Sequence, residues 1–265
     1  MGHWYNEDSL IHPTAVIHKN AKLGQGTIVG PFSIIGPEVE MGENCEIAAS
    51  VTIDGHTVMG SRNRIFNGAA ICLEPQDLKY KGESSRVVIG NGNTFREYVT
   101  VNRGTEGGGG ETRIGDNNLV MAYTHIAHDC RIGNGVLIAN STNMAGHVVI
   151  EDNAVLSGAT GIVQFVRIGT MAMTGGVSKL SKDLPPYFIA DGNPCRIRGI
   201  NKVGMMRNGL ESKTIKIVEK AYKLIYLSGM TLVKAMEIIE TDFGELNEIR
   251  KLLSFLKSSD KGIVR

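Results

Sequence analysis

Residues 11–35 read IHPTAVIHKNAKLGQGTIVGPFSII, and an aliphatic side chain recurs at every sixth position of this stretch. The period continues, with two interruptions and a break at Thr174, as far as Leu180. A spacing of six matches neither an α-helix, with about 3.6 residues per turn, nor simple strand alternation, with two. Hexapeptide repeats of this kind specify a parallel β-helix, in which three short strands make one 18-residue coil. We therefore predict a mainly β fold built from 18-residue coils.

The repeat divides the chain into two parts. We predict a β-helix over residues 1–190, with loops at 72–88 and 102–113 where the six-residue register is interrupted. Loops on a rigid scaffold commonly carry function. Residues 191–265 show helical apolar spacing and predict a small C-terminal α-helical domain, which would also cover the open end of the β-helix. Its helices are expected at 212–227, from the capping residue Thr231 onward, and at 245–256.

The charge and cysteine content narrow the class of protein. With 28 Lys+Arg against 27 Asp+Glu, the chain offers no electrostatic argument for nucleic-acid binding. It has no apolar run of 18 residues, and Met1–Ser9 is polar, so we expect no membrane insertion and no signal peptide. The four cysteines show no CxxC spacing, and Cys45 and Cys130 fall on the small inward position of the repeat. We therefore expect a cytoplasmic protein with reduced cysteines.

The 18-residue coil also predicts which polar residues meet. His128, Gly146 and Gln164 are spaced by 18 and should stack in one column. His147 should lie over Asp129 in the neighbouring column, and His125 near the preceding corner. An imidazole is the commonest general base near neutral pH. A backbone N–H beside it, at a residue without a side chain, can stabilise an oxyanion. The column therefore predicts a catalytic site.

A metal centre is the alternative for the histidines. His125, His128 and His147 resemble the three-imidazole zinc site of γ-type carbonic anhydrases, which are also β-helices. Zinc takes three protein ligands at about 2.0–2.1 Å with an open fourth position. The coil geometry puts His125 and His128 on different parts of the coil, so one subunit should not bring the three rings together. We therefore predict no metal.

Several motifs resemble a known enzyme family. They are, from the N-terminus, 76–80 (QDLKY), 100–105 (TVNRGT), 125–130 (HIAHDC), 145–147 (AGH), 191–194 (DGNP), 222–226 (YKLIY) and 262–265 (GIVR). In these motifs the chain resembles the UDP-N-acetylglucosamine O-acyltransferases, the hexapeptide-repeat acyltransferases of the first step of lipid A biosynthesis. The resemblance implies a left-handed parallel β-helix and a homotrimer with active sites between subunits. It implies transfer of a 3-hydroxyacyl chain from acyl carrier protein to the glucosamine 3-hydroxyl of UDP-N-acetylglucosamine, with no cofactor.

The resemblance also implies roles for residues at the matching positions. His128 would be the general base with Asp129 beside it, and the Gly146 N–H would donate to the oxyanion. Lys79 would bind a phosphate and Asp77 a sugar hydroxyl, although a solvated ion pair between the two is the alternative. The implied substrate contacts are Gln76, Asp77, Lys79, His125, His147, Gln164, Gly176, Asn201 and Arg207. Within this set, Gly176 would leave the acyl groove open, and Asn201 and Arg207 would reach the nucleotide of a neighbouring subunit.

Three other functions remain open at the level of sequence. An N-acyltransferase of the same pathway resembles this scaffold but carries a further N-terminal domain, whereas about ten residues precede the first repeat here. Other hexapeptide transferases use acetyl-CoA and do not need the QDLKY loop. A purely structural β-helix has no reason to align His, Gly and Gln. The sequence leaves open the acyl length and the choice between a hydroxyl and an amine acceptor.

Overall fold

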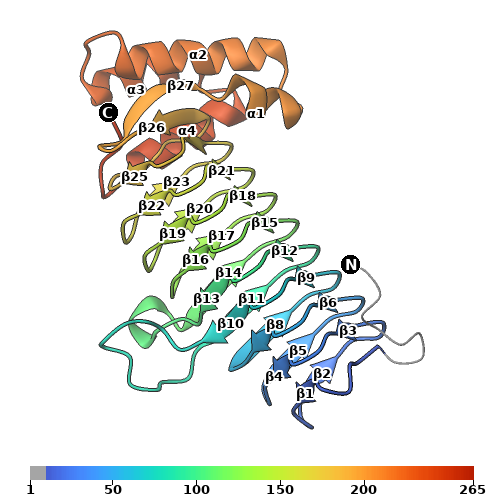
Figure 1. The fold of residues 1–265 in the computed structure, drawn as a ribbon. Coiled ribbons are helices and arrows are strands. Elements are labelled where there is room, and N and C mark those ends of the chain that lie inside the picture. The colour runs from blue at the N-terminus through green and yellow to red at the C-terminus, as the bar shows by residue number, and fades with distance from the viewer. Residues whose placement is uncertain (1–9) are drawn as a thin grey trace.

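The computed structural model describes residues 10–265 as a long stack of coils with a group of helices at its C-terminal end (Figure 1). The first nine residues, which include the polar Met1–Ser9 segment and the predicted start of the β-helix, lie outside the described part. Within it, the strands form three sheets, and each sheet takes every third strand along most of the stack. The chain therefore passes through all three sheets once per coil, as the six-residue period predicts.

The three sheets have 9, 8 and 10 strands within residues 10–265. The 9-stranded sheet contains β1 (Val16–Ile17), β4 (Ile34–Ile35), β7 (Thr52–Ile53), β10 (Ala70–Leu73), β13 (Thr100–Asn102), β16 (His125–Ile126), β19 (Asn143–Met144), β22 (Gly161–Ile162) and β25 (Lys179–Leu180). The 8-stranded sheet contains β2 (Lys22–Leu23), β5 (Val39–Met41), β8 (His56–Met59), β11 (Arg86–Ile89), β14 (Glu111–Ile114), β17 (Arg131–Ile132), β20 (Val149–Ile150) and β23 (Arg167–Ile168). The 10-stranded sheet contains β3 (Ile28–Val29), β6 (Glu46–Ile47), β9 (Arg64–Ile65), β12 (Thr94–Phe95), β15 (Leu119–Val120), β18 (Leu137–Ile138), β21 (Val155–Leu156), β24 (Met173–Thr174), β26 (Phe188–Asp191) and β27 (Arg196–Ile200).

The aliphatic residue of each hexad points into the stack. In the 9-stranded sheet Ile35 pairs with Ile53 and Ile53 with Ile71, 18 residues apart, and all three are at most 1% exposed. Such ladders of identical apolar side chains form one continuous core, to which each coil adds contacts with its two neighbours. The inward ladder is therefore the main source of stability.

Two interruptions of the repeat leave the stack as loops, and they are shorter than predicted. Parts of 72–88 and 102–113 remain in strands, because β10 reaches Leu73, β11 begins at Arg86 and β14 begins at Glu111. The segments that leave the stack are residues 74–85 and residues 103–110. The second loop contains the short 3₁₀ helix η1 (Glu106–Gly108). Both loops project from the same side of the stack (Figure 1).

A buried asparagine ladder crosses the coils that carry these loops. Asn63, Asn93 and Asn118 are at most 2% exposed. The side-chain oxygen of Asn63 accepts hydrogen bonds from the backbone and side-chain nitrogens of Asn93, and that of Asn93 does the same for Asn118. Neighbouring coils here are 30 and 25 residues apart instead of 18. The asparagine ladder thus holds neighbouring coils in register where the loops make the spacing along the chain longer than 18 residues.

The C-terminal part begins with β27, a strand that the sequence did not predict. β26 pairs in parallel with β24 and in antiparallel with β27, so the 10-stranded sheet continues beyond residue 190 into the predicted helical domain. Four helices follow: α1 (Lys202–Arg207), α2 (Ser212–Tyr226), α3 (Leu232–Phe243) and α4 (Asn247–Lys257). The last three match the expected helices, with Thr231 accepting the hydrogen bond of Lys234 N as a cap of α3. The short helix α1 lacks a full amphipathic period and was not expected.

All four cysteines are free thiols, as expected. Burial raises the pKa of the Cys130 thiol to about 12, so this thiol stays protonated at neutral pH. Within residues 10–265, none of the helices combines the length and the apolar character needed to cross a bilayer.

Candidate active site

His128 and Gly146 lie against each other, as the 18-residue spacing predicts. The His128 carbonyl accepts a hydrogen bond from His147 N at 3.0 Å, which joins the two coils at this corner. A Cβ built on Gly146 would lie 2.7 Å from Nε2 and 3.0 Å from Nδ1 of the His128 ring. Only glycine therefore leaves room for this imidazole. The Gly146 N–H donates no hydrogen bond within the described part of the chain, so it is available to a ligand.

Asp129 fixes the orientation of the His128 ring. His128 Nδ1 lies 2.7 Å from Asp129 Oδ2, and both residues are 5% exposed. An ionised carboxylate can only accept hydrogen bonds, so Nδ1 carries the proton. His128 Nε2 then has a free lone pair and can act as a base. Thr105, which was not among the predicted site residues, donates to both carboxylate oxygens of Asp129.

His147 and Phe165 extend the site along the same corner. The His147 ring meets the His128 ring edge-on, with centroids 5.2 Å apart, and stacks on Phe165 at 4.4 Å. Burial lowers the pKa of His147 below its usual range, and the neighbouring His128 acts in the same direction, while Asp129 and Asp77 oppose the shift. The His147 ring is therefore neutral at physiological pH. Phe165 was not among the predicted site residues.

His125 lies on β16, three residues before His128. Its Nδ1 is 2.7 Å from the Thr100 hydroxyl on the neighbouring strand β13. Burial lowers the pKa of the His125 imidazole, and the nearby His128 lowers it further. The neutral ring can therefore use its second nitrogen for a ligand.

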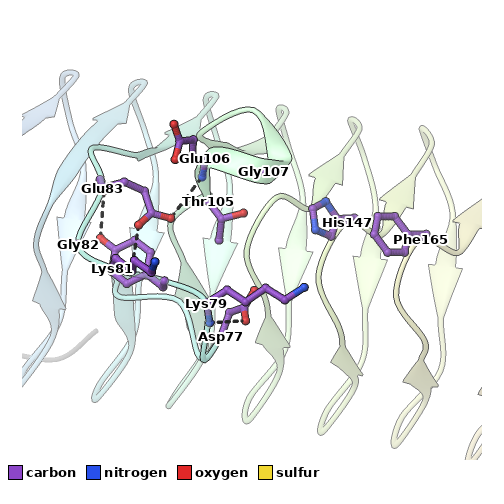
Figure 2. Close-up of a pocket in the computed structure, with 11 residues that line it drawn as sticks. Asp77, Lys79, Lys81, Gly82, Glu83, Thr105, Glu106, Gly107, His147 and Phe165 are labelled. Carbon is purple, nitrogen blue, oxygen red and sulfur yellow. Dashed lines mark hydrogen bonds between the residues drawn. The ribbon is translucent and has the colours of Figure 1, made fainter.

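The two loops and the histidine corner enclose a cavity of about 670 Å³. Its walls come from Asp77, Lys79, Tyr80, Lys81, Gly82 and Glu83 on the first loop, from Thr105, Glu106 and Gly107 on the second, and from the rings of His147 and Phe165 (Figure 2). The Asp77 carboxylate lies 4.0 Å from His128 Nε2, so the loop reaches the free nitrogen of the ring. His128, Gly146 and His125 are not among the residues that line the cavity, and Asp77 is the lining residue that approaches the candidate base.

The two charged loop residues do not pair with each other. Asp77 Oδ1 accepts a hydrogen bond from the backbone N of Lys79 at 3.0 Å, a contact that shapes the turn. Among the described residues no ion pair involves the Lys79 ammonium. The alternative of a mutual solvated ion pair is therefore not what the loop forms. Both residues line the cavity, with the Lys79 ammonium not paired to a carboxylate within residues 10–265.

Other predicted site residues lie outside this cavity. Gln164 lines a second hollow of about 660 Å³ with Asn143, Val177 and Asn193, on the face of β19 and β22. Gln76 and Gly176 are exposed and line neither hollow. Within one chain, the predicted substrate contacts therefore fall into separate groups.

Asn201 and Arg207 stand at the two ends of α1. Asn201 is 4% exposed; its Oδ1 accepts from Gly204 N, and its Nδ2 donates to Met171 O. Both polar atoms are thus engaged in capping α1 and tying it to the β-helix. Arg207 lies in the last turn of the helix and is exposed. Asn201 thus holds the helix that presents Arg207.

The cluster of candidate metal ligands differs from the zinc alternative considered above. The atoms that lie within 4.8 Å of one another belong to His128, Asp129 and His147, and His125 is not among them. His128 Nδ1 and Asp129 Oδ2 are hydrogen bonded to each other and are not directed at a common ion. The geometry favours a hydrogen-bonded pair over a metal centre.

Comparison with known proteins gives a consistent assignment. The family described as UDP-N-acetylglucosamine O-acyltransferase, domain 2, matches residues 183–264, and the bacterial transferase hexapeptide family matches 20–55 and 111–146. The acyl-[acyl-carrier-protein]–UDP-N-acetylglucosamine O-acyltransferase of Synechocystis is 51% identical over 187 residues, which span 71% of this chain and 67% of the relative. The UDP-N-acetylglucosamine acyltransferase structure of Francisella novicida has a TM-score of 0.94 at 39% identity, and the match covers 96% of this chain and 94% of the Francisella chain. The UDP-N-acetylglucosamine acyltransferase structure of Bacteroides fragilis has a TM-score of 0.93 at 42% identity, and the match covers 96% of this chain and 99% of that one.

These likenesses run through the β-helix and the helices that follow it. They confirm the predicted fold class, a left-handed parallel β-helix followed by a small C-terminal helical region. The left hand is the one feature of that fold that the period of six does not determine. The chain belongs to the UDP-N-acetylglucosamine O-acyltransferase family of hexapeptide-repeat enzymes.

Proposed function

We propose that this chain transfers a 3-hydroxyacyl group from acyl carrier protein to the 3-hydroxyl of UDP-N-acetylglucosamine, the first step of lipid A biosynthesis, with His128 as general base. The observation that carries this proposal is the 2.7 Å contact between His128 Nδ1 and Asp129, which leaves Nε2 free on the side of the ring that faces Gly146. The relatives that carry the acyl-carrier-protein and UDP-N-acetylglucosamine names support the choice of substrates.

The proposed reaction needs one base and one anion donor. A sugar hydroxyl is a weak nucleophile, so His128 Nε2 removes its proton as the oxygen attacks the thioester carbonyl. The carbonyl oxygen becomes an oxyanion, and the Gly146 N–H donates to it; such a donor is typically worth about 10²–10³ in rate. When the tetrahedral intermediate collapses, the C–S bond breaks and the His128 imidazolium returns its proton to the leaving thiolate. Asp129 stabilises the imidazolium while it exists.

The cavity of about 670 Å³ is the proposed site of the sugar nucleotide. Lys79 is suited to a phosphate, because its ammonium makes no ion pair within residues 10–265. Asp77 is suited to a sugar hydroxyl and lies close enough to His128 to bring that sugar to the base. His147 and Phe165 offer a stacked aromatic wall. The residues assigned to substrate contacts on family resemblance are Gln76, Asp77, Lys79, His125, His147, Gln164 and, for the acyl groove, Gly176.

We further propose that the site is completed in a homotrimer in the cytoplasm. Gln76, Gly176 and Arg207 are exposed in a single chain and do not line the cavity, which a site formed between subunits would explain. Helix α1 also exposes Val203 (53%) and Met206 (58%), two apolar side chains that a neighbouring subunit would cover. Arg207 is the proposed nucleotide contact across this interface. For Asn201 we propose an indirect role, because its side chain caps the helix that carries Arg207.

The test combines an assay with a measurement of mass. The purified chain is incubated with UDP-N-acetylglucosamine and a series of 3-hydroxyacyl carrier proteins, and products are analysed by mass spectrometry. We expect an ester at the glucosamine 3-position, a preferred acyl length within the series, and a trimer by light scattering. An analogue with an amine at the 3-position, offered in competition, decides between the two acceptors. Preferred acylation of the amine, or no transfer from any carrier protein, would refute the proposal.

A further inference from the structure

The glycine-rich loop that interrupts the repeat at residues 103–110 lies directly on Asp129. The backbone N of Thr105 donates to Asp129 Oδ1 at 2.9 Å, and its hydroxyl donates to Oδ2 at 2.6 Å. Oδ2 is the same oxygen that receives His128 Nδ1. Thr105 is 8% exposed, so these bonds are shielded from water. One threonine therefore engages both oxygens of the carboxylate that orients the base.

The glycines explain how the loop comes so close. A Cβ built on Gly108, the last residue of η1, would overlap the carboxylate carbon and both oxygens of Asp129. A Cβ on Gly107, one residue earlier, would meet nothing within 4 Å. The four-glycine run is thus needed at one position for direct approach to Asp129, which is 5% exposed beneath it. At Gly108 the loop backbone therefore packs against the Asp129 carboxylate itself.

We propose that Thr105 is a positioning residue for the His128–Asp129 pair, an inference that rests on the proposed function of that pair. Asp129 sits at a corner with φ of 60°, and its backbone N is held by the Thr112 hydroxyl at 2.8 Å. The side chain still has a free rotation that the backbone does not restrict. The two bonds from Thr105 remove that freedom and hold Oδ2 in line with Nδ1 of His128.

The loop does not depend on the Thr105 hydroxyl for its own anchorage. Gly110 O accepts from Arg86 N at 2.9 Å, and Gly110 N donates to Thr105 O at 2.8 Å. Arg103 donates to the Tyr80 hydroxyl at 3.0 Å and to Cys72 O at 3.3 Å. Removal of the hydroxyl alone therefore deletes one bond to Asp129 and leaves the loop in place. This separates a positioning role from a purely structural one.

The experiment compares Thr105→Val, which keeps the shape and loses the hydroxyl, with Thr105→Ser, which keeps it. Thr27→Val is the matched control, since the Thr27 hydroxyl is likewise buried and hydrogen bonded, to Gly42 O and from Cys45 N, far from the site along the chain. For Thr105→Val we expect kcat to fall about 10- to 100-fold, the usual effect of losing a hydrogen bond to a charged group, with KM for UDP-N-acetylglucosamine unchanged. Thr105→Ser should restore most of kcat. Thr27→Val should lower the melting temperature alone.

The pH profile supplies the readout that a structural role would not move. The titratable groups that face His128 are Asp129, Asp77, His147 and His125. Without the Thr105 hydroxyl Oδ2 is no longer held in line with Nδ1, so Asp129 stabilises the His128 imidazolium less and the acidic limb of the kcat profile should move to lower pH. An unchanged kcat and profile in Thr105→Val would overturn the inference, as would equal losses in the Val and Ser variants.

A second readout does not depend on the reaction. Nitrogen-15 spectra of the imidazoles, with the His128 signals assigned by loss in His128→Gln, report whether Nδ1 carries the proton. We expect a single Nδ1–H form in the wild type and in Thr105→Ser, and a mixture of the two tautomers in Thr105→Val at neutral pH. If the wild type transfers no acyl group but the spectra differ as stated, the proposed function fails and the positioning role stands. Identical spectra in all three proteins refute the positioning role.

Discussion

Gly146→Ala tests whether the glycine is there for the imidazole. The added Cβ would lie 2.7 Å from His128 Nε2, whereas non-bonded heavy atoms settle at about 3.5–4.0 Å. The ring must therefore withdraw by about 1 Å. That movement breaks the 2.7 Å contact with Asp129 or turns Nε2 away from the substrate. A misplacement of about 1 Å costs on the order of 10²-fold in rate, so kcat should fall by about that factor or more. The Gly146 N–H is retained in the alanine variant, so the fall in kcat reports the displacement of the His128 ring.

The assay is steady-state acyl transfer to UDP-N-acetylglucosamine, with melting temperature and mass measured in parallel. Gly158→Ala is the matched control, because Gly158 also precedes a corner residue of positive φ and its Cβ would meet only Asn140 O, at 3.3 Å. Overpacking costs about 1–3 kcal/mol of stability, which a long stack of coils should tolerate. We expect Gly158→Ala to keep its kcat. A Gly146→Ala protein that is folded and turns over like the wild type would refute the assignment of this glycine to the base.

Three further predictions follow from the same contacts. Asn93→Ala should lower stability by about 2–6 kcal/mol, because it leaves the backbone and side-chain donors of Asn118 buried without an acceptor; a melting temperature close to that of the wild type would contradict this. The pKa of His125 is lowered in the fold, so its contribution to stability is fully present above its unfolded value, about 6.5, and is lost as pH falls through the folded value. His125→Gln should therefore reduce the drop in melting temperature between neutral and acidic pH, and an unchanged drop would argue against it. Lys79→Ala should raise KM for UDP-N-acetylglucosamine with little change in kcat, whereas a kcat effect alone would remove Lys79 from the phosphate role.

The fold could be predicted from sequence because the inward aliphatic residue at every sixth position determines how the coils stack. Ile35, Ile53 and Ile71 are in register because a coil has a fixed length, and the same rule placed His128 against Gly146. The hand of the helix could not be predicted, since the inward pattern is the same for either hand. Strand β27 was missed because it pairs antiparallel and has no place in the six-residue register.

The candidate site was only partly predictable for a different reason. The period specifies residues on the coils but says nothing about where a loop returns. Thr105 lies 24 residues from Asp129, which is not a multiple of the 18-residue coil, and meets it because the glycine run folds back over the corner. Its signal in the sequence was the cluster of glycines, which marks a close backbone approach without naming the partner. The assignment of Asn201 as a ligand contact rests on family resemblance and stays a prediction; within one chain its side chain is buried and caps α1.

The central claim is that His128 acts as the base for acyl transfer to UDP-N-acetylglucosamine, and the most direct measurement is the turnover of His128→Gln. Glutamine can still donate a hydrogen bond to Asp129 but cannot accept the proton of the sugar hydroxyl. We predict that kcat falls by about 10²–10⁴, the usual contribution of a general base, while the oligomeric state and the affinity for UDP-N-acetylglucosamine, measured by calorimetry, are retained. Wild-type turnover in His128→Gln, or a loss explained entirely by weaker binding of UDP-N-acetylglucosamine, would contradict the claim.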